Sequence, residues 1–516
     1  MRTKQAFKNA STSMLLQLVL ALSGIIIPRF FIALYGSAVN GLVSSISQFI
    51  SYMALVEAGI GAAGTVALYK PIADKNQDRI NGIVSAAKSF YLRSGAIFLG
   101  LLIALIIFYP FAVKNEIQNI SFIRTMIFVL SVNGIVDYFY LGKFRVLLMA
   151  DQKGYIISIA QIIGTVLMTV VCVILMELGC SALLVKGTNA VIYILRSLIV
   201  GLYVKRNYPK VNFKAKPLFS AFGQRWAALL HQIVGMIVNN TAVILMTLLL
   251  SGNALSEISV FTLYNLVAAS LYGVMNSIST GLGSGFGEVI STGETDVLKR
   301  SFKSYEYAFF LMTFIVFTCM SALLYPFIGL YSASFTDGVN YLRWPLVALF
   351  TISGILQSLR LPGLTLICAA GHYKETQGRA IAEAVINIAV SLVLIKPLGI
   401  IGVLIGICTS YLYRTSDVIV YSAKHFVRGT LKTSVLRIIR NVLASAILIT
   451  LGIWLIPSST DSWLALIVYA LIFGTLSLVT LTLVNFVCEP NEFKNLLGRI
   501  KDISVTLYFR FSRVLR

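Results

Sequence analysis

The chain has 516 residues, of which 58% are hydrophobic and only 12% are charged, and its mean hydropathy is +0.86. A soluble domain usually carries about a quarter charged residues, so this composition excludes an ordinary soluble protein and indicates an integral membrane protein. The formal charge of +22 does not indicate nucleic-acid binding, because the basic residues lie in separate short segments where anionic lipid headgroups attract them.

Apolar segments of about 20 residues, the length that crosses a bilayer, recur along the whole chain. They predict an all-α membrane protein with about 14 transmembrane helices. The predicted spans are 13–34, 40–68, 83–110, 121–141, 155–177, 182–203, 226–250, 257–280, 304–330, 342–368, 379–396, 400–422, 441–457 and 463–487. The first span is too long for the apolar region of a signal peptide, so we expect it to be retained.

The spans contain no catalytic or metal-binding motif. The six cysteines are scattered without a C-x-x-C spacing, and we interpret them as packing residues that form neither a disulfide nor a metal site. The alternating glycines from Gly281 to Gly287 do not follow a strand and do not fit a dinucleotide-binding pattern. We therefore expect no enzyme activity, no catalytic residues and no cofactor.

The lysines and arginines predict the orientation, because short loops rich in these residues stay in the cytoplasm. Both termini and the even-numbered connections are basic, whereas the odd-numbered connections and their edges hold only Lys114, Arg343 and Lys396. Both termini are therefore predicted to be cytoplasmic. The outer connections are all short, which argues against an external catalytic domain.

The basic linker 205–222 divides the chain into two halves. In each half a glycine-rich stretch is followed by a polar loop and a Lys-Ser-aromatic sequence, at Lys88 and at Lys303. Internal repeats of this kind are common in transporters. We predict a six-helix lobe at 1–204, a second six-helix lobe at 223–432, an appended helix pair at 433–488 and a cytoplasmic amphipathic tail at 489–516.

Polar side chains at membrane depth are the candidate functional residues, because they are costly in a bilayer and usually face a bundle interior or a wet cavity. In the first half they are Gln17, Arg29, Glu57 and Asp137. Arg29 is a candidate phosphate ligand, with snorkelling to the outer interface as the alternative. The depths of Arg29 and Glu57 differ by roughly 18 Å along the helices, so we expect no direct pair. Glu57 and Asp137 are candidates for ion coupling, with a packing role as the alternative.

The second half holds a further polar set, formed by Asn239, Asn240, Arg360, Glu383, Arg414 and Asp417. Arg360 and Glu383 lie at depths that differ by about 5 Å, so they can pair. Arg414 and Asp417 are three residues apart on one helix, and a local ion pair is the structural alternative to a functional role. The two asparagines of span 7 could bind sugar hydroxyls or join helices, and both interpretations stay open.

Several short motifs accompany these residues. They are Ile27-Pro28-Arg29-Phe30 with Gly36 and Gly41, Glu57-Ala58-Gly59-Ile60-Gly61, Asn239-Asn240-Thr241, Leu361-Pro362-Gly363, the stretch from Ala369 to Thr376, and Gly399-Ile400-Ile401-Gly402-Val403. With these motifs, fourteen predicted spans and buried arginines, the chain resembles the Wzx-type oligosaccharide flippases of the multidrug/oligosaccharidyl-lipid/polysaccharide exporter superfamily.

The resemblance implies export of a polyprenyl-pyrophosphate-linked oligosaccharide repeat unit across a bacterial inner membrane, by alternating access of two lobes, for capsule or exopolysaccharide biosynthesis. A polysaccharide polymerase would then be a partner. The pyrophosphate would contact Arg29, Arg360 and Arg414, and the sugars would contact amide groups such as those of Gln17, Asn239 and Asn240. Glu57, Asp137, Glu383 or Asp417 could couple transport to H⁺ or Na⁺.

Two other functions are alternatives. A drug/cation antiporter of the same superfamily would typically have twelve spans and carboxylates without cavity arginines. A membrane-embedded glycosyl ligase or polymerase would need a large outer loop, and the predicted outer loops are short.

Overall fold

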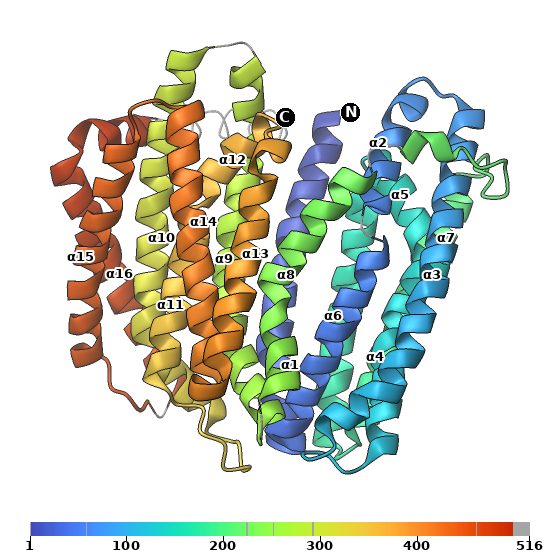
Figure 1. Ribbon diagram of the computed structural model, residues 1–516, viewed down its shortest axis with the longest axis horizontal. Helices are drawn as coiled ribbons and strands as arrows, with labels where there is room; N and C mark the ends of the chain where they lie inside the picture. The colour runs from blue at the N-terminus through green and yellow to red at the C-terminus, as the bar shows by residue number, and fades with distance from the viewer. Residues whose placement is uncertain are drawn as a thin grey trace, which may run out of the picture. The chain divides into compact units, whose positions relative to one another are not determined.

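The computed structural model describes residues 2–57, 59–222, 225–250, 252–291, 294–460 and 462–498, and these residues form helices and connecting turns without a β-strand, as predicted. The helices in chain order (Figure 1) are α1 (Arg2–Met53), η1 (Ala54–Glu57), α2 (Ile60–Ala73), α3 (Gln77–Val113), α4 (Ile120–Val136), η2 (Asp137–Leu141), α5 (Gly142–Ala150), α6 (Gly154–Glu177), α7 (Ala182–Asn207), η3 (Phe219–Phe222), α8 (Arg225–Leu249), α9 (Ala254–Ser291), α10 (Thr295–Ser332), α11 (Trp344–Leu359), α12 (Leu361–Ala369), α13 (Tyr373–Leu398), α14 (Ile400–His425), α15 (Leu431–Leu455) and α16 (Trp463–Cys488).

Twelve helical stretches within this described part of the chain are long and apolar enough to cross a membrane. The chain is therefore a multi-pass membrane protein, but the predicted count of fourteen spans is not confirmed. Predicted span 1 and most of predicted span 2 fall in the 47-residue stretch Ser11–Glu57, and the predicted seventh span contributes only the shorter apolar stretch Asn240–Leu249. Each other predicted span coincides with one of the twelve stretches.

Several helices begin before the apolar segments that predicted them. Helices α3, α10 and α15 start at Gln77, Thr295 and Leu431, ahead of the predicted starts at 83, 304 and 441. Hydropathy marks the part of a helix in the membrane, whereas the helix itself continues into polar sequence until a cap ends it. For α3 this cap is Asn76, whose side chain accepts a hydrogen bond from the amide of Arg79 at 3.0 Å.

The first membrane-spanning stretch is broken at two glycines. Gly36 has φ 81° inside α1, which therefore consists of two helices that meet at a kink, in the interval between the predicted spans 13–34 and 40–68. The amide of Ser37, freed by the kink, donates to the carboxylate of Asp337 at 2.6 Å. Gly59 has φ 83° and starts α2 after the 3-10 turn of η1. Both glycines adopt a left-handed conformation that disfavours side chains.

The chain forms two compact units. The first comprises Met1–Thr262 with Ser334–Val339, and the second comprises Leu263–Ala333 with Asn340–Arg516. The division falls within α9, so the units do not coincide with the lobes predicted on either side of the linker 205–222, and that lobe division stays a prediction.

In the first unit, α1 packs on α6, α6 on α7, and α7 on α4, while α2 packs on α3 and α5. The predicted linker belongs to this unit and is held on the start of α3. Ser85 donates to the backbone carbonyl of Ala215 at 2.6 Å, and the carbonyl of Gly82 accepts from the amide of Leu218 at 2.9 Å. The linker is therefore an ordered segment docked on α3.

In the second unit, α10 contacts α11, α15 and α16, and α13 packs along α14 (Figure 1). The core around α10 contains Phe310 and Phe314, together with Phe473 and Leu481 from α16. The helix pair predicted as an appendage therefore contributes to the hydrophobic core of this unit. The predicted amphipathic tail is described only to residue 498, and its remainder lies outside the described residues.

Candidate functional site

The first polar group lies in the first unit, where α4 passes into the π-helical turn η2. Asp137 opens this turn, and its Oδ1 accepts hydrogen bonds from Arg145 Nη2 at 2.8 Å and from the Tyr193 hydroxyl at 2.6 Å. Arg145, which the sequence places in a cytoplasmic loop, lies on α5. The carboxylate of Asp137 thus has a cationic and a hydroxyl partner.

Glu57 ends η1 beside this group. Its Oε2 is buried without a hydrogen-bond partner among the described residues, and the side chain lies within electrostatic range of Arg145 and Asp137. The backbone carbonyls of η1 accept hydrogen bonds from Ser94 at 3.1 Å and from Tyr138 at 3.3 Å. These bonds stabilise the helix break. They hold Glu57 in a position where one carboxylate oxygen has no hydrogen-bond partner among the described residues. Such a group can take up a proton or a cation.

The other candidates of the first unit are more dispersed. Arg29 is half-buried in α1, seven residues before the kink, and Gln17 is exposed. On α8, Asn240 donates to the sulfur of Met236 at 3.3 Å, and the side chain of Asn239 lies outside the described residues. The roles of these four residues in substrate binding stay predictions.

The second polar group is a chain of ion pairs in the second unit. Arg360 Nη1 donates to Glu383 Oε1 at 2.5 Å, as the matched depths predicted. The other oxygen of Glu383 lies 3.6 Å from Arg414 Nε, and Arg414 Nη1 binds Asp417 at 2.8 Å. Asp417 also pairs with Arg379. We call Arg360, Arg379, Glu383, Arg414 and Asp417 the five-residue ion chain.

The position of Arg360 follows from a break between two helices. Arg360 ends α11 and precedes α12, whose second residue is Pro362, and a proline fits the first turn of a helix because the amide it lacks would have no partner there. Its guanidinium lies 4.8 Å from the centre of the Tyr411 ring, and its Nε has no hydrogen-bond partner among the described residues. Arg360, Glu383 and Arg414 are each less than a tenth exposed.

The five-residue ion chain carries three arginines and two carboxylates, so its formal charge is +1 when all are ionised. The surplus charge belongs to Arg379, whose side chain is 41% exposed, because the buried arginines Arg360 and Arg414 are balanced by Glu383 and Asp417. Guanidinium groups bind phosphate oxygens in pairs. The unused Nε of Arg360 is a donor that such an anion could occupy.

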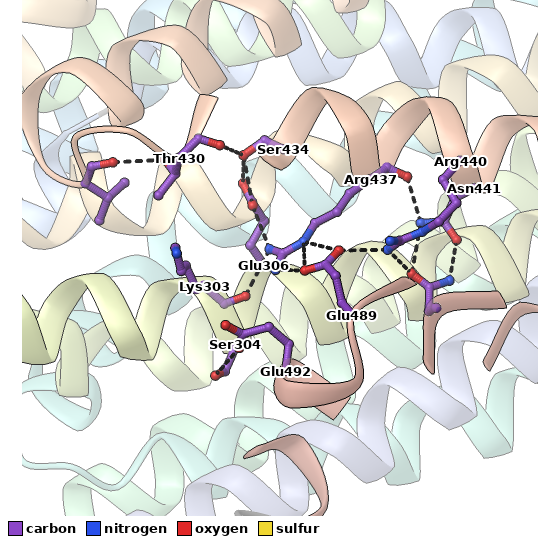
Figure 2. Close-up of polar contacts among 12 residues, drawn as sticks. Lys303, Ser304, Glu306, Thr430, Ser434, Arg437, Arg440, Asn441, Glu489 and Glu492 are labelled. Carbon is purple, nitrogen blue, oxygen red and sulfur yellow. Dashed lines mark hydrogen bonds and ion pairs between the residues drawn. The ribbon is translucent and has the colours of Figure 1, made fainter. Parts of the chain in front are cut away.

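A third polar group, which the sequence did not predict, joins α10, α15 and the end of α16. Figure 2 shows Arg437 between Glu306 and Glu489. Arg437 Nη1 donates to Glu306 at 3.0 Å and Nη2 to Glu489 at 2.5 Å. Arg440 pairs with Glu489 at 3.0 Å, and Ser434 donates to Glu306 at 2.8 Å. Arg437 is 1% exposed and Glu306 3%, so this group is part of the core.

The sequence contained a signal for this third group. The buried polar residues Ser434, Arg437, Asn441 and Ser445 follow one another at spacings of three and four, which is one face of a helix. Because the predicted span began only at 441, Arg437 and Arg440 were interpreted as loop residues that set the orientation. The structure corrects this interpretation, since both lie within α15. Glu489 has two arginine partners, and although its burial disfavours ionisation, their guanidinium groups hold its pKa below the ordinary value.

No protein-family model and no curated protein matches this chain. Solved structures, however, share its fold. A structure titled lipid II flippase MurJ, inward closed conformation, is 14% identical with a TM-score of 0.68, over 93% of this chain and 98% of its own. An inward-facing multidrug resistance MATE family transporter of the MOP superfamily is 14% identical with a TM-score of 0.59, over 83% of this chain and 99% of its own.

A MATE transporter of Vibrio cholerae is also 14% identical, with a TM-score of 0.54 over 82% of this chain and 96% of its own. At this identity the likeness establishes a common fold. The chain therefore has the helical fold found in a lipid flippase and in multidrug transporters, and its substrate must be argued from its own residues.

Proposed function

We propose that this protein is a flippase that moves a polyprenyl-pyrophosphate-linked oligosaccharide from the inner to the outer leaflet of a bacterial inner membrane by alternating access. The observation that carries the proposal is the five-residue ion chain, because it combines three arginines, two of them buried, with an unused guanidinium donor. The shared fold with a structure titled lipid II flippase, over 93% of this chain, supports it.

The five-residue ion chain suggests how a bound pyrophosphate would change the ion pairs around Arg360. A pyrophosphate that approaches Arg360 competes with Glu383 for the same guanidinium, since that carboxylate is its ion-pair partner. Once displaced, Glu383 is a buried carboxylate that retains only the 3.6 Å contact with Arg414. Arg29 would supply a second phosphate contact.

Glu57 is the proposed site of ion coupling in the first unit. Its Oε2 is buried without a hydrogen-bond partner among the described residues, whereas Asp137 already has Arg145 and Tyr193 as partners. A proton or Na⁺ would satisfy Glu57, so we assign coupling to Glu57 in preference to Asp137. The neutral amides of Gln17, Asn239 and Asn240 are the proposed sugar contacts, and a polysaccharide polymerase is the proposed recipient of the flipped lipid.

The proposal is tested in cells that depend on this protein for surface polysaccharide. We expect Arg360→Ala and Arg29→Ala to abolish surface polysaccharide and to leave the amount of protein in the membrane normal. The matched control is Arg300→Ala, which removes an exposed arginine from the start of α10. Polysaccharide at the wild-type level in both Arg360→Ala and Arg29→Ala would rule out pyrophosphate recognition by these arginines.

A drug/cation antiporter is the second candidate, because MATE transporters share the fold. The two MATE structures cover 83% and 82% of this chain and nearly all of their own length, whereas the MurJ structure covers 93%. The longer match favours the flippase. Export of cationic drugs that survives Arg360→Ala would favour the antiporter.

A further inference from the structure

A polar cavity next to the first polar group opens between α5, α6 and α7 of the first unit. Its volume is about 340 Å³, and its lining includes Arg145, Gln161, Arg196 and Ser197. Arg145 is the ion-pair partner of Asp137, but Arg196 forms no ion pair with any described residue. Two arginines and one carboxylate give the cavity a formal charge of +1, so it is suited to an anion.

An apolar groove continues from this cavity along α6 and α7. The groove has a volume of about 200 Å³, is lined by residues such as Ile159, Ile163, Leu195 and Ile199, and shares Arg196 with the polar cavity. Ile163 and Ile199 are 61% and 60% exposed, which places the groove on the surface that faces lipid in a membrane-spanning helix pair.

The side chain of Arg196 is fixed where the cavity and the groove meet. Its guanidinium lies 4.1 Å from the centre of the Tyr193 ring, and a Cβ at Gly164 would lie 3.1 Å from its Cδ. The absence of a side chain at Gly164 therefore lets Arg196 lie across α6. Arg196 lines both the polar cavity and the apolar groove, and an arginine can contact apolar surface with its aliphatic part and an anion with its guanidinium.

We propose that this cavity and groove bind an anionic phospholipid of the surrounding membrane. The headgroup phosphate would accept hydrogen bonds from Arg145 and Arg196, and an acyl chain would lie in the apolar groove between α6 and α7. A soluble anion would use the two arginines but not the groove, whereas a neutral phospholipid would use the groove but leave the excess charge unmatched. The combination of both features selects a lipid with net negative charge.

The proposed lipid site includes Arg145, which lies within electrostatic range of Glu57, the proposed coupling residue. Arg145 binds Asp137, and both lie within electrostatic range of Glu57. A phosphate bound to Arg145 would compete with Asp137 for this guanidinium. It would also add negative charge near Glu57. Anionic lipid would therefore favour the protonated form of Glu57, whichever substrate the protein carries.

Native mass spectrometry of the purified full chain in detergent, titrated with phosphatidylglycerol or phosphatidylcholine, tests the lipid site. We expect one tight phosphatidylglycerol, about tenfold weaker binding in Arg196→Ala, and an intermediate affinity in Arg196→Lys. Gly164→Leu should weaken binding by displacing Arg196. The control is Arg93→Ala, which removes an exposed arginine of α3 that lies over Phe219 and should leave binding unchanged.

Competition experiments distinguish a phospholipid from a soluble phosphate or a prenyl-pyrophosphate lipid as the ligand of this site. Glycerophosphate, which lacks acyl chains, should not displace the bound phosphatidylglycerol at equal concentration. Equal displacement by glycerophosphate, equal binding of phosphatidylcholine, or equal phosphatidylglycerol affinity in Arg196→Ala and Arg93→Ala would each overturn the proposal. Displacement only by a prenyl-pyrophosphate lipid would also overturn it and assign the site to the transported substrate. Thermal unfolding of each variant confirms that it is folded.

Discussion

Arg360 Nη1 lies 2.5 Å from Glu383 Oε1, and both side chains are less than a tenth exposed. This ion pair joins the break between α11 and α12 to the middle of α13. Removing two charges from water is costly, and the cost is offset only by good geometry and additional hydrogen bonds. In this pair the desolvation cost is only partly offset, because Arg360 Nε has no hydrogen-bond partner among the described residues. The pair therefore keeps one buried donor that an additional acceptor could satisfy.

Loss of one partner from this pair should destabilise the second unit. In Glu383→Gln the guanidinium of Arg360 stays buried without its carboxylate, so we expect the free energy of unfolding to fall by about 3–5 kcal/mol. The double variant Arg360→Met with Glu383→Leu should recover most of that loss, because it removes the unpaired charge of Arg360 while Arg414 keeps Asp417 as its partner. Denaturant unfolding in detergent micelles measures both. A double variant no more stable than Glu383→Gln would contradict this explanation.

A pair of glycine substitutions tests the packing of α1. A Cβ at Gly41 would lie 1.7 Å from the backbone oxygen of Leu255, at the start of α9, and a backbone atom cannot move aside. We expect Gly41→Ala to lower the unfolding temperature, with a cost of about 1–3 kcal/mol or more. Gly100→Ala meets no atom within 4 Å and should be neutral or stabilising by roughly 0.5–1 kcal/mol. Equal unfolding temperatures for the two variants would show that α1 and α9 do not pack closely.

Acid should weaken the third polar group through Glu489. Its pKa is lowered in the folded chain, so the stabilisation is present above the unfolded value, about 4.3, and is lost as the pH falls through the folded value. We therefore expect the difference in unfolding free energy between wild type and Glu489→Gln to be full at pH 7. It should shrink as the pH is lowered below about 4. A difference that stays constant down to pH 3 would exclude this linkage.

Replacement of Glu57 should separate transport from its driving force. Because Glu57→Gln removes the group proposed to take up the ion, the remaining flipping should no longer respond when an ionophore dissipates the ion gradient. The control is Asp137→Asn, in which the ionophore should still inhibit. The coupling role is excluded if ionophore inhibits Glu57→Gln as strongly as wild type.

The membrane class, the helical architecture and the Arg360–Glu383 pair could be predicted from the sequence, because all three depend on apolar length and helical rise. The Arg437 group could not be found by the same reasoning. Arg437 and Arg440 precede the apolar part of α15, and a hydropathy profile does not distinguish a loop from a polar helical turn that is buried by neighbours. The partners of Asp137 were missed for a similar reason, since Arg145 and Tyr193 come from α5 and α7, and only tertiary structure brings them together.

The most direct test of the proposed function is a flipping assay with the purified full chain in proteoliposomes. A labelled polyprenyl-pyrophosphate oligosaccharide is placed in the inner leaflet, and a membrane-impermeant glycosidase detects the fraction that reaches the outer leaflet. The proposal predicts flipping by the wild type and by Arg300→Ala, and a loss of about tenfold or more in Arg360→Ala. Flipping by Arg360→Ala at the wild-type rate, or wild-type flipping no faster than in protein-free vesicles, would contradict it.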